Sequence, residues 1–306
     1  MSKVIITAAV NGNRMDTDGT FIPVAPEEIG RDARECRDAG AAVVHFHARD
    51  VKTRRSTADV RVFGETISSI RSHCDALIET TTGIGPKIDQ ATGKPVLDPV
   101  TGSIIRPTDD ERLALVDLDP PQDLGSVSSG SMNMHNPVYE NPSVFANSPY
   151  YIRESVVRMS RKTALAFQFE IFDIGFLMNV QRLITGGILD RRLGRFWLNY
   201  VLGFGGLEPS ARHLAIIHSE GQRLFPDVVW GTLAPGPEHF NVSAVGSALG
   251  ADVLRTGFED TIHLPNGDLA GRNARLVEAL VKIVRATGRD IASPEEARIR
   301  FGLPPA

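Results

Sequence analysis

Three observations predict that this chain folds as an α/β protein, a single (β/α)8 barrel. Eight apolar segments with strand patterns occur along the 306 residues, each followed by a helix or a helical stretch. No glycine-rich phosphate fingerprint follows the first segment, which disfavours an open nucleotide-binding sheet. Polar residues gather where the strand patterns end, and barrel enzymes carry their catalytic groups at such positions.

The first two strands and the helix between them are marked by local residue chemistry. A β-rich run at 4–10 predicts the first strand. The helix after it begins at Pro26, because proline with acids in the first turn is typical of a helix N-terminus, and it ends at Gly40. The second strand, 43–50, runs from valines into polar residues, as expected of a buried strand that opens into a loop.

A long insertion follows the third strand. The helix before that strand covers 58–73, where apolar residues recur at helical spacing, and the strand itself covers 76–82. The connection at 85–109 contains two Thr-Gly turns that predict a small hairpin. We expect it on the catalytic side of the barrel, as a lid or a subunit contact; the alternative is a passive surface excursion.

The rest of the chain repeats the pattern of apolar strands with polar ends. We expect strands at 124–130, 164–173, 196–203, 228–233 and 251–260. We expect helices at 149–161, 177–184, 210–221, 242–249 and 269–287. Residues 288–306 form a C-terminal tail with a short capped helix. The sequence therefore predicts one barrel domain over 1–306.

Composition excludes several classes of partner. The net charge is -4 without a basic tract, so neither nucleic acid nor an anionic membrane surface is expected. The sequence begins without a signal-peptide pattern and contains no run of 18 apolar residues, which predicts a cytoplasmic protein. Cys36 and Cys74 lack metal-site spacing and are expected to be reduced thiols.

Two histidines and a glutamate at strand ends predict a metal site. His45 and His47 share one face of their strand, with Cα atoms about 6.5 to 7 Å apart, close enough to ligate one ion. Barrel closure brings the last strand near them, and Glu259 at its end is our third ligand. This set is typical of catalytic Zn²⁺, although it also suits Mn²⁺ or Fe²⁺. The alternative is a pair of hydrogen-bonded histidines.

Two more charged residues belong to the last strand. Asp260 should turn away from the metal toward the loop, as a general base or as a loop cap. Arg255 shares a face with Glu259 and points into the barrel, where it needs a carboxylate partner. That partner is the substrate, or else Glu170 or Asp260 in a structural ion pair.

Together these motifs resemble the β-keto acid cleavage enzyme family, whose best-known activity is 3-keto-5-aminohexanoate cleavage. The similarity covers nearly the whole chain, and the His-x-His and Gly-x-Glu-Asp motifs at opposite ends are specific in combination. The segments that carry it lie at 8–12, 26–29, 39–50, 169–173 and 255–260.

The resemblance implies a zinc-dependent barrel that condenses a β-keto acid with acetyl-CoA and releases acetoacetate and a new acyl-CoA. It implies that His45, His47 and Glu259 bind zinc, that Asp260 forms the enolate and that Arg255 is its electrostatic partner. It further implies substrate contacts from Thr81 or Thr82, from Ser128 or Ser129, and from Glu170 and Asn11. The family likeness also implies a homotetramer. Aromatics at Tyr139, Phe145, Tyr150 and Tyr151 form a subunit contact, or else pack under the nearby helix.

The loop after the first predicted strand departs from the pattern of the family. It lacks the glutamate expected in the aminohexanoate enzyme, which argues against an aminated substrate. Arg14 in this loop would suit a second anionic group; the alternative is a solvent-exposed arginine. Two rival functions stay open: a CoA-independent metal-dependent aldolase or decarboxylase, and a catalytically silent barrel that binds a small carboxylate over a structural zinc.

Overall fold

A closed barrel of eight parallel strands forms the centre of the computed structural model, which describes residues 3–17, 19–134 and 143–305. Around the barrel the strands follow the order β1, β10, β9, β8, β7, β4, β3 and β2. Their bounds are β1 Ile5–Ala9, β2 Val43–Phe46, β3 Leu77–Thr80, β4 Leu124–Ser128, β7 Ala166–Ile171, β8 Phe196–Val201, β9 Trp230–Leu233 and β10 Val253–Thr256. The predicted (β/α)8 barrel is confirmed.

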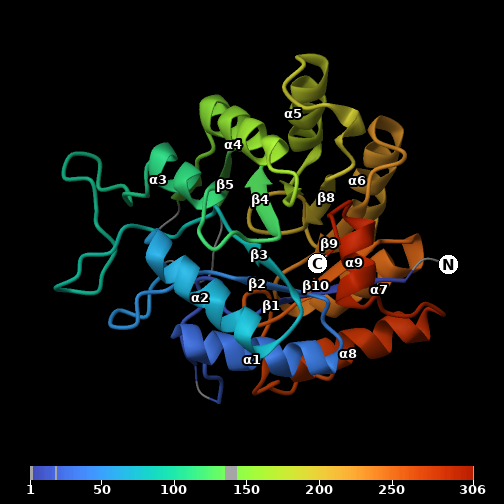
Figure 1. Ribbon diagram of the computed structural model, residues 1–306, viewed down its shortest axis with the longest axis horizontal. Coiled ribbons are helices and arrows are strands. Elements are labelled where there is room, and N and C mark those ends of the chain that lie inside the picture. The colour runs from blue at the N-terminus through green and yellow to red at the C-terminus, as the bar shows by residue number, and fades with distance from the viewer. Residues whose placement is uncertain (1–2, 18, 135–142, 306) are drawn as a thin grey trace.

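Helices surround this barrel on its outside (Figure 1). They are α1 Pro26–Ala39, α2 Val60–His73, α3 Asp109–Leu113, α4 Pro149–Arg161, α5 Ile174–Thr185, α6 Ala211–Leu224, α7 His239–Leu249, α8 Asn273–Ala286 and α9 Pro294–Arg300. Helix α5 begins three residues before its predicted start, because the Asp173 side chain accepts a hydrogen bond from the backbone N–H of Phe176 and caps the helix. Along the described parts of the chain, none of the helices has the length and apolar character that crossing a bilayer requires.

The C-terminal helix α9 packs against one end of the barrel. The Phe301 ring that follows it lies 5.6 Å from the Trp197 ring on β8, within an apolar cluster that includes Val253 and Leu124. Arg300 beside it donates to Asp252, at the start of β10. Because both partners precede or begin their strands, the tail covers the N-terminal end of the barrel and leaves the C-terminal end for the site.

The insertion after β3 forms two tight turns. Residues Ile88 and Pro95 bridge across the first, and Leu97 and Ile104 across the second, as the predicted hairpin requires. Figure 1 shows the segment extending away from the barrel beside α3. The boundaries 85–109 for an insertion and 288–306 for a tail within one domain stay predictions, as does the lid or subunit role.

A small antiparallel hairpin that we did not predict follows β4. It consists of β5 (Met132–Met134) and β6 (Ser143–Phe145). Of the four aromatics predicted to form a subunit contact, Tyr151 and Phe145 are buried and Tyr150 is 56% exposed, while Tyr139 lies outside the described residues. Packing inside this chain therefore accounts for two of them.

Gly257 allows the chain to turn from β10 toward Glu259. Its φ is +147°, and a Cβ atom there would lie 2.1 Å from the carbonyl oxygen of Ala9. We expect Gly257→Ala to lower the free energy of unfolding by about 3 kcal/mol, from strain and overlap together. Urea unfolding measures this loss, with Gly288→Ala as the control, because Gly288 also has positive φ but faces open space. An equal loss of unfolding free energy in both variants would contradict a contribution from overlap with Ala9.

Candidate metal centre and active-site cavity

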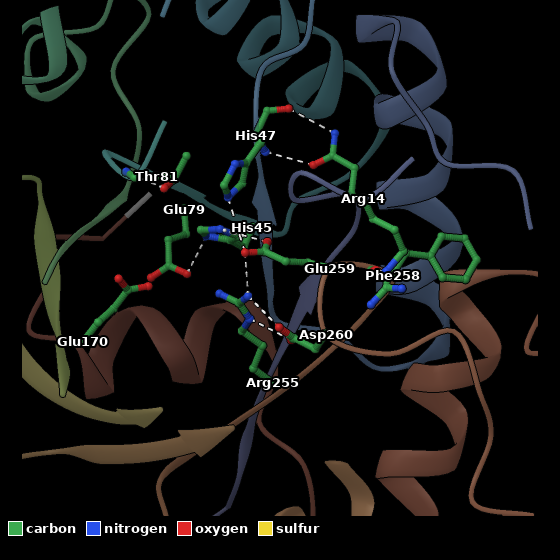
Figure 2. A network of polar contacts seen from close by, with 12 residues as sticks. Arg14, His45, His47, Glu79, Thr81, Glu170, Arg255, Phe258, Glu259 and Asp260 are labelled. Atoms are coloured by element: carbon green, nitrogen blue, oxygen red, sulfur yellow. Dashed lines mark hydrogen bonds and ion pairs between the residues drawn. The ribbon is translucent and has the colours of Figure 1, made fainter. Parts of the chain in front are cut away.

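Two histidines and a glutamate converge above the C-terminal end of the barrel (Figure 2). The Nε2 atom of His45 lies 3.4 Å from one Glu259 oxygen, and Nε2 of His47 lies 3.3 Å from the other. Ligands placed tetrahedrally at about 2.1 Å from one ion lie about 3.4 Å apart. Glu259 Oε2 is buried and accepts no hydrogen bond from the described residues. The three side chains therefore fit a zinc-sized ion.

Strand register explains how residues far apart in sequence meet here. Strand β1 lies between β2 and β10, and its Ala9 pairs with His45. Ala9 also accepts the backbone hydrogen bond from Glu259, at 3.2 Å. The barrel closure that we expected from the sequence therefore brings the segment after β10 across β1 to the histidines.

Asn11 holds His47 through the main chain. Its side-chain oxygen accepts from the His47 backbone N–H at 2.9 Å, and its amide nitrogen donates to the His47 carbonyl at 3.0 Å. The side chain is fully buried and is not part of the cavity wall. Asn11 thus fixes the chain that carries a candidate ligand, and the structure gives no support to its predicted substrate contact.

A buried series of hydrogen-bonded side chains orients His45, and our sequence analysis did not predict it. Its Nδ1 lies 3.0 Å from a carboxylate oxygen of Glu79, on β3 (Figure 2). The other Glu79 oxygen accepts from Gln168 at 2.9 Å, and Gln168 accepts from Asn199 at 2.7 Å. A carboxylate that accepts from Nδ1–H leaves Nε2 free to bind metal. The pairing of Glu79 with His45 in the β2–β3 register is the signal that could have revealed it.

We expect Glu79→Ala to weaken zinc binding about 100-fold and Glu79→Gln about 10-fold. The alanine removes the acceptor for His45, whereas the glutamine amide keeps one acceptor but sets its NH2 group against the NH2 of Gln168. Competition with a chromophoric chelator measures both affinities. Wild-type affinity in Glu79→Ala would contradict an orienting role for this carboxylate.

Opposing effects set the protonation of the two histidines. Burial by itself lowers the pKa of His45, but the Glu259 carboxylate and the bond to Glu79 raise it to about 9. Burial lowers the pKa of His47 despite the same glutamate. Burial would raise the pKa of Glu259, but Arg255 and the histidines hold it well below its usual value. Since His45 carries a proton near neutral pH, metal binding would release that proton.

Arg255 connects Glu259 to Asp260 (Figure 2). Its Nε and Nη2 atoms donate to the two Asp260 oxygens at 2.9 and 2.8 Å, and Nη2 lies 2.9 Å from Glu259. Asp260 is fully buried and lies behind Arg255, which lines the cavity. The Asp260 carboxylate thus lies outside the cluster of His45, His47 and Glu259 and faces Arg255 rather than the loop. The ion pair with Asp260 that we considered for Arg255 is present.

A second carboxyl group reaches the cavity from β7. Glu170 accepts a hydrogen bond from the Ser128 hydroxyl at 2.6 Å. Burial raises the pKa of Glu170, although Ser128 and Arg255 oppose this shift. Because Glu170 lines the cavity and carries a raised pKa, it is able to exchange a proton nearer neutral pH than an exposed glutamate.

The four predicted hydroxyls divide between cavity and scaffold. Thr81 lines the cavity, whereas Ser128 lies outside the wall and donates a hydrogen bond to Glu170. Thr82 instead donates to the carbonyl of Ser126, and Ser129 donates to the carbonyl of Phe176. Neither Thr82 nor Ser129 belongs to the cavity wall. The structure therefore gives no support to their predicted substrate contacts.

The candidate metal site opens into a cavity of about 800 Å³, which is within the size range of small-molecule sites. The polar residues of the wall lie on β7 and β10 and in the connections after β1, β2, β3 and β10, and the apolar residues come mainly from β5, β6, β9, α7 and the loops after β7 and β8. They include Arg14, His47, Thr81, Arg106, Glu170, Arg255, Glu259 and His263, with Met134, Phe145, Phe172, Phe204, Leu233 and Phe240.

Comparison with known proteins identifies the family. Residues 3–303 match the beta-keto acid cleavage enzyme family. This chain is a member of that family. It is 30% identical over 317 residues to a 3,5-dioxohexanoate:acetyl-CoA acetone transferase from Paraburkholderia graminis, covering 97% of this chain and 94% of the relative. The predicted family is thereby confirmed, and an enzyme is supported.

Other relatives within the family differ in their keto acid. A 3-keto-5-aminohexanoate cleavage enzyme from Fusobacterium nucleatum is 28% identical, covering 97% of both chains. A 3-oxoadipate:acetyl-CoA acetyltransferase from Cupriavidus necator is 26% identical, covering 98% of this chain and 95% of the relative. Among solved structures, a ternary complex of ObcA with a C4-CoA adduct and oxalate matches with a TM-score of 0.71 at 16% identity, covering 92% of this chain and 68% of ObcA, which supports the barrel fold.

Proposed function

We propose that this protein is a zinc-dependent β-keto acid cleavage enzyme that converts a β-keto acid and acetyl-CoA to acetoacetate and a new acyl-CoA. The observation that carries the proposal is the cluster of His45, His47 and Glu259 at the head of a large cavity in a chain of this family. Two neutral nitrogens and one carboxylate with an open side are typical of catalytic zinc. They do not resemble a closed structural site, which usually has four protein ligands.

The three ligands would hold zinc at the wall of the cavity. Zinc bound there would polarise the keto and carboxylate oxygens of a β-keto acid and lower the cost of an enolate at the carbon between them. The silent barrel with structural zinc is disfavoured further because Cys36 and Cys74 lie away from the cluster, on and after the outer helices α1 and α2.

We assign the removal of the substrate proton to Asp260. Its two oxygens are held by Arg255, which itself faces the cavity. As negative charge develops on the substrate, the Arg255 guanidinium is attracted toward it and frees an Asp260 oxygen to accept the proton. Arg255 then stabilises the enolate, and Thr81 and Glu170 contact the substrate from the wall.

The rest of the reaction exchanges two acyl groups on one carbon. The enolate carbon attacks the acetyl-CoA thioester, forming a carbon–carbon bond and releasing the CoA thiolate. The thiolate attacks the original keto carbon, and the bond from that carbon to the enolate carbon breaks. The products are the new acyl-CoA and acetoacetate, which takes up the proton, so no oxidant or covalent enzyme intermediate is needed.

Mass spectrometry of CoA esters tests this proposal. Zinc-loaded protein is incubated with acetyl-CoA and neutral, anionic or aminated β-keto acids. We expect a new acyl-CoA together with acetoacetate, and neither product after zinc is removed. Consumption of keto acid without any acyl-CoA would instead support the CoA-independent aldolase or decarboxylase. The homotetramer and the cytoplasmic location remain predictions; light scattering on the purified protein tests the first.

A further inference from the structure

Arg14 brings a cationic group to the cavity beside the candidate metal site. It lies in the loop after β1 and lines the cavity. Its Nε donates to the carbonyl oxygen of Phe258 at 2.6 Å, and Phe258 directly precedes Glu259 (Figure 2). The guanidinium is therefore attached to the segment that carries a candidate metal ligand.

The loop that carries Arg14 is held firmly against this segment. The buried Arg49 donates to the Arg14 carbonyl oxygen at 2.7 Å. Gly12 has a φ of +54°, and a Cβ atom there would lie 2.3 Å from Cγ of Glu259, so loop and ligand are in close contact. These contacts set the position of the guanidinium relative to the metal site before any substrate arrives.

Arg14 forms no direct ion pair with a carboxylate among the described residues. Among residues 3–17, 19–134 and 143–305, no carboxylate oxygen lies within 4 Å of its guanidinium, because Glu259 and Asp260 are both engaged by Arg255. Burial lowers the pKa of Arg14, although the more distant carboxylates of Asp260 and Glu259 oppose this shift. Its bond to Phe258 uses Nε alone, so the two terminal nitrogens remain for an anion.

We infer that Arg14 binds a second anionic group of the keto acid, so that the preferred substrate is a β-keto dicarboxylate. The inference rests on the proposed function, in which the keto-carboxylate end lies at the metal. A carboxylate at the far end of a short acid can then reach Arg14 next to Glu259. An ammonium group in that position would be repelled by the guanidinium. The phosphates of acetyl-CoA also carry anionic oxygens, but the pantetheine arm separates them from the reacting thioester.

Three six-carbon acids that share the keto-carboxylate end test the inference: 3-oxoadipate, 3-oxohexanoate and 3-keto-5-aminohexanoate. Their kcat/KM values are compared in the wild type, Arg14→Met and Arg14→Lys. We expect the wild type to have its highest kcat/KM with 3-oxoadipate. In Arg14→Met this value should fall about 100-fold, whereas kcat/KM with 3-oxohexanoate should change little. Arg14→Lys keeps the positive charge but lacks the planar guanidinium, so its kcat/KM with 3-oxoadipate should lie between the values of the wild type and Arg14→Met.

Other outcomes overturn the inference in distinguishable ways. A raised KM for acetyl-CoA in Arg14→Met, with the preference among keto acids unchanged, would assign Arg14 to CoA phosphate. Equal losses on all three acids would make Arg14 a structural residue. A wild type that favours the aminated or neutral acid would exclude a dicarboxylate preference. If no acid gives acyl-CoA with the wild type, the proposed function itself fails.

Discussion

His47→Ala is expected to abolish acyl-CoA formation and to weaken zinc binding by about 1,000-fold or more. The variant removes a nitrogen that lies 3.3 Å from Glu259 and belongs to the only cluster of potential metal ligands found among the described residues. Loss of a direct ligand should exceed the 10- to 100-fold effects typical of residues that only orient ligands. Metal content by elemental analysis and chelator competition measure the change.

His263→Ala provides the matched control for this variant. His263 also lines the cavity but lies outside the ligand cluster. We expect it to retain one zinc per chain and most of the activity. Stoichiometric zinc in His47→Ala would contradict the proposed site, and so would loss of zinc in His263→Ala with retention in His47→Ala.

Asp260→Asn is expected to lower kcat by about 10³- to 10⁴-fold while zinc remains bound. The amide cannot accept the substrate proton, and general acid–base catalysis typically contributes about 10²- to 10⁴-fold, so the expected loss lies in the upper part of this range. It is nearly isosteric, so Arg255 keeps one acceptor, although an NH2 group now faces the guanidinium. Steady-state kinetics with metal analysis of the same samples separate loss of chemistry from loss of the metal.

Glu170→Gln tests the same assignment from the other carboxyl group. Glu170 faces the cavity directly and is held by Ser128, so it is the other described carboxyl group placed to exchange a proton. We expect Glu170→Gln to lower kcat about 10- to 100-fold, as the loss of a substrate contact would. A larger loss in Glu170→Gln than in Asp260→Asn would transfer the role of base to Glu170.

Most of the fold and the ligand cluster follow from short-range patterns in the sequence. The spacing of His45 and His47 fixes their common face, and the count of strands predicts closure, which brings Glu259 to them. These inferences need only the periodicity of strands and the connectivity of a barrel. No knowledge of side-chain packing is required for them.

The parts that the sequence did not reveal depend on contacts across the barrel. Glu79 and Gln168 lie on β3 and β7, which are separated by β4, and they meet only inside the closed barrel. Likewise, Thr81 faces the cavity while its neighbour Thr82 bonds to the main chain of β4, because the backbone has left the strand at this point. The periodicity of residues predicts neither the tilt of the strands nor the path of a loop.

An isotope experiment tests the proposed reaction most directly. Zinc-loaded protein is given a β-keto dicarboxylate and acetyl-CoA with ¹³C at both acetyl carbons, and the products are analysed by mass spectrometry. The proposed exchange predicts that both labelled carbons are found in acetoacetate and that the new acyl-CoA is unlabelled. Label in free acetate, with CoA transferred to the intact keto acid, would show that no carbon–carbon bond is formed or broken and would contradict the proposal.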